Sequence, residues 1–187
     1  GLEEVARIGA RFLDDVVSIN SFPATEVADA VAQTRKTGLG VMGWHDALIR
    51  LGIEYESEEA LALAQRVMGT ITNAAREVSI GLSQERGAYP AWQPASPGEP
   101  PIRNATRTCI APTGSISAIA AASSGIEPVF ALAFVKNVLD GKHLREVNQD
   151  FERIAMERGF YSDELMEEMA RTGSCQHLDQ VPDDVKR

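Results

Sequence analysis

The chain has 187 residues, of which 44% are hydrophobic and 24% are charged, and 27 acidic against 18 basic residues give a formal net charge of −9. This composition is typical of a globular domain, and its acidity excludes attraction to nucleic acids by bulk charge. No apolar run reaches the roughly 20 residues that cross a bilayer, and the two cysteines form no disulfide framework, so we expect a cytoplasmic protein without membrane or nucleic-acid partners.

The first half of the chain has the apolar spacing of helices. The predicted helices cover 2–20, 24–35, 44–51 and 57–86. Ser57 is the N-cap of the last helix, which is roughly 45 Å long and suits the outside of a large barrel or sheet. Between these helices, residues 36–43 form a glycine-rich connection or a short strand, and five prolines in 88–103 indicate a loop.

The second half mixes short strands with helices, which together predict an α/β fold rich in helices. We expect a strand at 109–111, a helix from Ile116 to Ala120, a turn at 123–128 and a doubly buried strand at 129–135. A further helix is marked by Leu144, Val147, Phe151, Ile154 and Ala155 and ends at Gly159. Ser162 caps a last helix to about Arg171, and the tail from Gly173 is expected to be irregular.

Residues 106–117 hold the strongest signal for binding. An apolar run stops at Pro112, a loop of small residues follows, and Ile116-Ser117 can open a helix. The N–H groups of such a loop and of a first helical turn lack intrahelical acceptors, and the helix dipole adds partial positive charge. Because Gly114 has no side chain, the backbone can approach an anion closely. The pattern predicts a phosphate cradle, and the alternative is an ordinary strand-to-helix turn.

Gly38-x-Gly40-x-x-Gly43 matches the dinucleotide-binding fingerprint, with acidic residues following at 58–59. That fingerprint requires a buried strand directly before the first glycine. Residues 33–37 are polar and follow a helix, so close packing of a strand against the next helix is the favoured interpretation.

The other candidate residues carry weaker signals. His45, His143 and His177 lack metal-ligand spacing and are expected at the surface or at helix ends, so we predict no metal site. Cys109 is expected to be an inert core thiol. Cys175, in the polar tail, is expected to be a bystander, and the alternative is a redox thiol. Ser115 lacks the Gly-x-Ser-x-Gly context of a hydrolase nucleophile. The carboxylate of Glu127 is expected to be solvated or to accept a hydrogen bond as a cap.

Two motifs together resemble the large catalytic subunit of ribonucleotide reductase. They are Ala-Pro-Thr-Gly-Ser-Ile-Ser at 111–117 and Ser-Ser-Gly-Ile-Glu-Pro-Val-Phe-Ala at 123–131. Segments 38–43, 51–60 and 103–106 fit the same family in the same order. The amino-acid sequences of the two motifs are most similar to those of the adenosylcobalamin-dependent class II enzymes, while class I enzymes share the Gly-Ile-Glu-Pro turn.

The resemblance implies that residues 1–187 are a partial catalytic domain, a portion of a ten-stranded α/β barrel that reduces the ribose of a ribonucleotide by radical chemistry. It implies that Pro112, Thr113, Gly114, Ser115 and Ile116 hold the substrate phosphates, and that Ser117 and Glu127 lie in an active-site loop. It further implies adenosylcobalamin as cofactor, bound by no residue identifiable here, and an external thiol reductant such as thioredoxin.

The family's thiyl cysteine lies in an Asn-x-Cys-x-Glu pattern that is absent here, as is its redox pair of cysteines. We therefore expect no catalytic residue in this chain, which would be a C-terminal-side piece, truncated at both ends, that requires the remainder of the barrel. Two alternatives stay open. One is a nicotinamide-dependent oxidoreductase using Gly38, Gly40 and Gly43, and the other is a non-catalytic domain whose helix 57–86 docks another protein.

Overall fold

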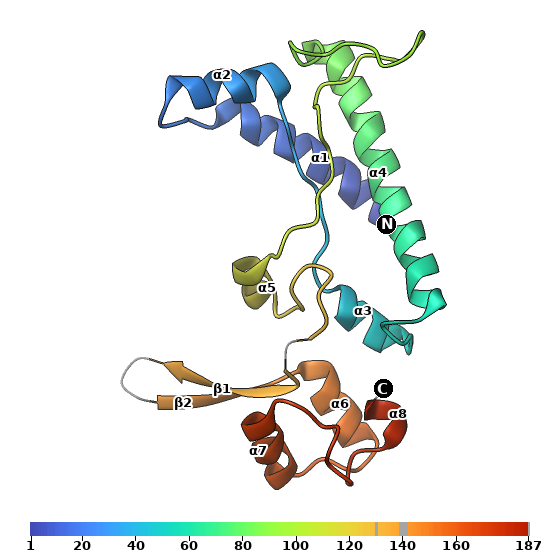
Figure 1. The fold of residues 1–187 in the computed structure, drawn as a ribbon, viewed down its shortest axis with the longest axis vertical. Helices are drawn as coiled ribbons and strands as arrows, with labels where there is room; N and C mark the ends of the chain where they lie inside the picture. The colour runs from blue at the N-terminus through green and yellow to red at the C-terminus, as the bar shows by residue number, and fades with distance from the viewer. Residues whose placement is uncertain (130, 139–141, 187) are drawn as a thin grey trace. The chain divides into compact units, whose positions relative to one another are not determined.

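The computed structural model describes residues 1–129, 131–138 and 142–186 (Figure 1). The chain divides into two compact units, one of residues 1–41 and 61–111 and the other of residues 42–60 and 112–187. No helix in the described part of the chain has the length and apolarity needed to span a bilayer.

The first unit is built on α1 (Leu2–Ile19), α2 (Thr25–Thr34) and most of α4 (Glu58–Arg86). Ala6 of α1 is buried in one small cluster with Ile71 and Ala74 of α4. All three helices were predicted from apolar spacing. The predicted cap of α4 is also present, since Ser57 Oγ accepts a hydrogen bond from the Ala60 N–H at 3.1 Å.

The strands predicted around residues 36–43 and 109–111 reduce to one parallel bridge between Leu39 and Thr108. The Leu39 N–H donates to the Arg107 carbonyl at 2.8 Å, and the Cys109 N–H donates to the Leu39 carbonyl at 3.1 Å. A two-stranded pairing is barely stable by itself, and no further strand extends this ladder within the described residues. The expected strand at 109–111 is therefore wrong as a regular element, although its parallel pairing exists.

The second unit contains α3 (Trp44–Leu51), α5 (Gly114–Ala120), the strands β1 (Ala133–Val138) and β2 (Lys142–Val147), α6 (Gln149–Glu157), α7 (Asp163–Thr172) and α8 (Asp183–Lys186). Helix α7 packs against β1 (Figure 1). The buried core of the second unit consists of eight residues: Ala133, Phe151, Ala155, Leu165, Met166, Met169, Cys175 and Val181. The predicted Ser162 cap is confirmed, because its Oγ accepts from the Leu165 N–H at 3.0 Å.

The strand and helix boundaries predicted for 129–155 are wrong. Strand β1 starts at Ala133 and pairs with β2 antiparallel, in the register Ala133 to Val147, so it is not a strand of a parallel sheet. The predicted strand also included Phe130, which lies outside the described residues. Leu144 and Val147 belong to β2, and the helix begins only at Gln149. Asn148 sets that start, since its side chain accepts from the Phe151 N–H at 3.0 Å.

Candidate functional site

The phosphate cradle predicted at 112–117 lies at the start of α5. Thr113 precedes the helix in the left-handed conformation, with φ of 52°, and its carbonyl accepts from the Ser117 N–H at 2.8 Å. The helix begins at Gly114, two residues earlier than predicted. Gly114, Ser115 and Ile116 are exposed, and no acceptor for their N–H groups is found among the described residues. The first turn therefore presents free donors to solvent.

Gly114 leaves the space beside this turn open. A Cβ built on Gly114 meets no atom within 4 Å, and its φ is not in the left-handed region. A side chain at this position would thus cause no clash and no backbone strain. It would instead stand in the open space beside the first turn of α5.

The loop 123–128 is tied to this turn by two hydrogen bonds. Thr113 Oγ1 accepts from the Gly125 N–H at 2.7 Å, and the hydroxyls of Ser117 and Ser124 lie 2.9 Å apart. Ser117 is buried, so its hydroxyl acts inside the protein. Glu127 is exposed, and its N–H donates to the Ser124 carbonyl at 2.9 Å. The hydrogen bond between Thr113 and Gly125, which are 12 positions apart, joins the motifs at 111–117 and 123–131 into one folded unit.

Helix α3 holds the same loop from its N-terminal end. Asp46 is buried, and its carboxylate accepts from the Ser123 N–H at 2.6 Å. The Ser123 carbonyl accepts from the Gly43 N–H at 2.7 Å. Gly43 has φ of 73°, a conformation that glycine adopts without strain. Residue 123 is thus held on both its N–H and its carbonyl.

His45 and Tyr55 hold the far side of the loop. His45 Nδ1 accepts from the Val129 N–H at 2.7 Å, and the Tyr55 hydroxyl donates to the Ile126 carbonyl at 2.6 Å. The two rings meet edge to face with centroids 5.1 Å apart. Burial lowers the pKa of His45, against the opposing charge of Asp46. Sequence reasoning predicted His45 at the surface or at a helix end, and gave Asp46 and Tyr55 no role.

The glycine motif does not form a dinucleotide site. Residues Thr25–Thr34 are α2, so no buried strand comes before Gly38. A Cβ at Gly38 would lie 2.6 Å from Cys109 Sγ, and one at Gly40 would lie 2.5 Å from the Cys109 carbonyl oxygen. These glycines permit close backbone packing, but against residues 108–109 and not against the helix that follows them, as the packing interpretation had it.

Both cysteine environments were predicted wrongly. Cys109 is exposed and its thiol donates to the Gly38 carbonyl at 3.3 Å, because the strand that would have buried it is absent. Cys175 is buried in the core of the second unit, and this burial raises the pKa of its thiol. His177 is exposed, with Nε2 3.8 Å from Glu168, and the side chain of His143 lies outside the described atoms. No cluster of metal-ligating side chains occurs among the residues described.

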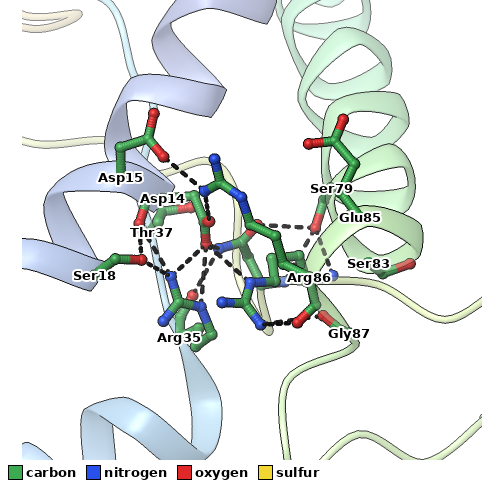
Figure 2. A network of polar contacts seen from close by, with 12 residues as sticks. Asp14, Asp15, Ser18, Arg35, Thr37, Ser79, Ser83, Glu85, Arg86 and Gly87 are labelled. Atoms are coloured by element: carbon green, nitrogen blue, oxygen red, sulfur yellow. Dashed lines mark hydrogen bonds and ion pairs between the residues drawn. The ribbon is translucent and has the colours of Figure 1, made fainter.

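A polar network that the sequence did not reveal lies in the first unit (Figure 2). Asp14 is fully buried, and its carboxylate accepts from Arg35 Nη2 at 2.8 Å, Asn104 Nδ2 at 2.9 Å and Arg86 Nη1 at 3.1 Å. Burial by itself would raise the pKa of Asp14, but the hydrogen bonds from Arg35 and Asn104 outweigh it and lower the pKa. The network joins α1, α4 and the segment that contains Asn104, so it is structural.

Comparison with known proteins gives one consistent match. The family described as "Ribonucleotide reductase, barrel domain" matches residues 1–99 and 98–187. The vitamin B12-dependent ribonucleoside-diphosphate reductase of Mycobacterium tuberculosis (strain ATCC 25618 / H37Rv) is 48% identical over 99% of this chain and 26% of its own length. That of Thermoplasma acidophilum is 46% identical over 100% of this chain and 24% of its own length.

More distant relatives are similar too. The ribonucleoside-diphosphate reductase subunit alpha of Chlamydia muridarum is 29% identical over 99% of this chain and 21% of its own length. Among solved structures, the alpha subunit of the Actinobacillus ureae class Id ribonucleotide reductase superimposes with a TM-score of 0.78 at 27% identity, covering 98% of this chain and 34% of that one. The chain spans about a quarter of the length of the B12-dependent relatives, whose matched shares are 26% and 24%.

Proposed function

Because this chain belongs to the family of the ribonucleotide reductase barrel domain, we propose that it is the part of a ribonucleoside-diphosphate reductase that holds the phosphates of the substrate. The observation that carries this proposal is the exposed first turn of α5, where three N–H groups lack acceptors. An anion at this turn gains hydrogen bonds and a favourable interaction with the helix dipole. The chain as a whole is acidic, so attraction for phosphate has to be local in this way.

Within the proposed cradle, Pro112 to Ile116 surround the phosphates. Gly114 leaves room for close approach, and Thr113, whose Oγ1 already accepts from Gly125, retains its hydroxyl proton to donate. Ser117 supports the cradle from inside through Ser124. Glu127 stays exposed on the loop that Thr113 fixes, as an active-site loop requires.

The proposed enzyme depends on adenosylcobalamin, because the relatives at 46–48% identity are named vitamin B12-dependent. The described residues do not fit this cofactor. A hollow in the second unit has a volume of about 790 Å³, which is the size of a site for a drug-sized molecule, and a corrinoid is larger. In the proposal, the rest of the polypeptide holds the cofactor, and no step of its chemistry is assigned to residues 1–187.

The reactive thiols, like the cofactor, are assigned to the rest of the polypeptide. Neither Cys109 nor Cys175 lies in an Asn-x-Cys-x-Glu pattern, so the thiyl cysteine and the redox pair belong to other parts of the enzyme. In the cytoplasm, a thiol reductant such as thioredoxin regenerates that pair. Residues 1–187 contribute one portion of the ten-stranded barrel, and the parallel pairing of Leu39 with Thr108 supports this because barrel strands of that kind are parallel.

A valine at position 114 tests the cradle in the reductase polypeptide that contains this segment. Gly114→Val fills the open space beside the first turn of α5, so we expect the Kd for cytidine diphosphate to rise at least about tenfold, the equivalent of one charge-assisted hydrogen bond. Gly69→Val is the matched control, since Gly69 is also helical and also has no atom within 4 Å of a built Cβ. Equal affinities of the Gly114→Val variant and the unmodified protein, by calorimetry, would refute the cradle.

A further inference from the structure

Asp46 differs from the other buried first-turn aspartate of the second unit. Asp150 of α6 is paired with Arg50 at 2.9 Å and with Arg153 at 3.2 Å. Asp46 forms no ion pair with a cation of the described residues, although only 8% of it is exposed. A buried carboxylate without a cation is unfavourable unless hydrogen bonds stabilise it. The partner of Asp46 is the Ser123 N–H, at 2.6 Å, which is a charge-assisted hydrogen bond.

Ser123 connects Asp46 to the cradle by a short covalent path. The next two residues, Ser124 and Gly125, make the hydrogen bonds to Ser117 and to Thr113. The carbonyl of Ser123 is held at the same time by the Gly43 N–H, so the residue cannot shift along the loop without losing a bond. A displacement at Ser123 would therefore move Gly125, and with it the hydroxyl of Thr113.

We infer that Asp46 is a positioning residue of the phosphate cradle, acting through Ser123 on Thr113 and the first turn of α5. The inference rests on the proposed function, because it assumes that this turn binds the substrate phosphates. Asp46 does not reach the ligand itself. Its carboxylate fixes the loop 123–125, and this loop fixes the orientation of the donors that the ligand uses.

Three variants of the full-length reductase separate this role from a general contribution to stability. Asp46→Ala removes the acceptor and leaves the Ser123 N–H without a partner, so we expect the Kd for cytidine diphosphate to rise about tenfold. Asp46→Asn retains an oxygen acceptor and should keep the Kd within about threefold of the unmodified protein. Asp150→Ala is the control: it releases Arg50 at the other end of α3 without touching Ser123, and should lower the melting temperature but leave the Kd unchanged.

Turnover with adenosylcobalamin and dithiothreitol gives a second readout. Because Asp46 acts on binding, Asp46→Ala should raise KM by the same factor as Kd, and kcat at saturating cytidine diphosphate should stay within about twofold. A loss of kcat with unchanged KM contradicts the inference, as does an equal rise in Kd for the Asp150→Ala variant. If the Asp46→Ala variant fails to fold, Asp46→Ser carries the same comparison, because the shorter side chain cannot reach the Ser123 N–H.

A double-mutant cycle tests the route through Thr113. Thr113→Val already releases Gly125, so adding Asp46→Ala should raise the Kd by less than the product of the two single effects. Independent, multiplicative effects would overturn the coupling. If the unmodified protein binds no cytidine diphosphate, the proposed function fails together with this inference. If it binds and Asp46→Ala binds equally, only the positioning role fails.

Discussion

Thr113 Oγ1 accepts a hydrogen bond from the buried N–H of Gly125 at 2.7 Å, and both residues adopt left-handed backbone conformations, with φ of 52° and 51°. For a β-branched residue such as Thr113 this conformation is strained. The hydrogen bond to Gly125 and the first α5 bond from Ser117 offset that strain. The start of α5 and the Gly-Ile-Glu-Pro turn are therefore one folded unit.

Replacing Thr113 by valine tests how much the hydrogen bond between Thr113 and Gly125 contributes to stability. Thr113→Val retains the shape but removes the acceptor, leaving the Gly125 N–H buried without a partner, and should lower the free energy of unfolding by about 1–3 kcal/mol. Thr113→Ser retains the hydroxyl and is the matched control. Urea denaturation of the two variants measures the difference, and equal stability would show that the hydrogen bond contributes nothing.

The Asp14 network should be the most sensitive point of the first unit. Asp14→Ala leaves the guanidinium of Arg35 buried without its carboxylate, and should lower the free energy of unfolding by about 3–5 kcal/mol. Asp15→Ala is the control: its side chain is 47% exposed and pairs with Arg86 near the surface, so we expect a loss of about 0–1 kcal/mol. Chemical denaturation measures the free energy of unfolding of both variants. Similar losses of stability for Asp14→Ala and Asp15→Ala would contradict the structural role given to Asp14.

His45 should make the second unit sensitive to mild acid. Its Nδ1 accepts from the Val129 N–H, which requires the neutral ring, and burial lowers its pKa below the usual 6.5. Because the unfolded chain binds this proton more readily, the stability is complete above pH 6.5 and falls as the pH drops through the folded pKa. His45→Asn keeps an acceptor that does not titrate in this range.

The slope of the unfolding free energy between pH 6.5 and 5 should therefore be smaller in His45→Asn than in the unmodified chain. His143 and His177 are common to both proteins, so the difference between them isolates His45. Parallel pH profiles would mean that the bond to Val129 does not depend on protonation.

The two thiols should react at different rates. Cys109 is exposed, whereas Cys175 is 3% exposed and burial raises the pKa of its thiol, which lowers the thiolate fraction. With iodoacetamide at pH 8, peptide mass spectrometry should show Cys109 alkylated at least about tenfold faster. In denaturing urea the two rates should converge. Faster labelling of Cys175 in the folded protein would contradict its burial.

The helices could be predicted because their signals are local. Apolar spacing defined α1, α2 and α4, and the serines at 57 and 162 marked helix starts through their own side chains. The hairpin could not be predicted in this way. Leu144 and Val147 have a spacing that fits a helix as well as a strand, and the choice depends on pairing with β1.

The same difference between local signals and long-range contacts applies to the candidate site. Small residues and a helix start predicted an exposed turn with free N–H groups at 112–117, because such groups at a helix start are a local property. The residues that hold it in place had no such signal. Asp46 lies 77 positions from Ser123, and Tyr55 lies 71 positions from Ile126, so only the folded chain reveals their roles.

The parallel pairing of residues 37–39 with 106–109 also has a consequence for synthesis of the protein. Thr37 and Thr106 bond to each other across 69 positions of the chain. At translation rates of 5–20 residues per second, the first segment emerges roughly 3–14 seconds before its partner. Helices α1 and α4 form from local contacts within that time, while the N–H groups of the Thr37–Leu39 segment wait unpaired. This interval on the ribosome is when the nascent chain is most open to pairing with a wrong strand and to recognition by chaperones.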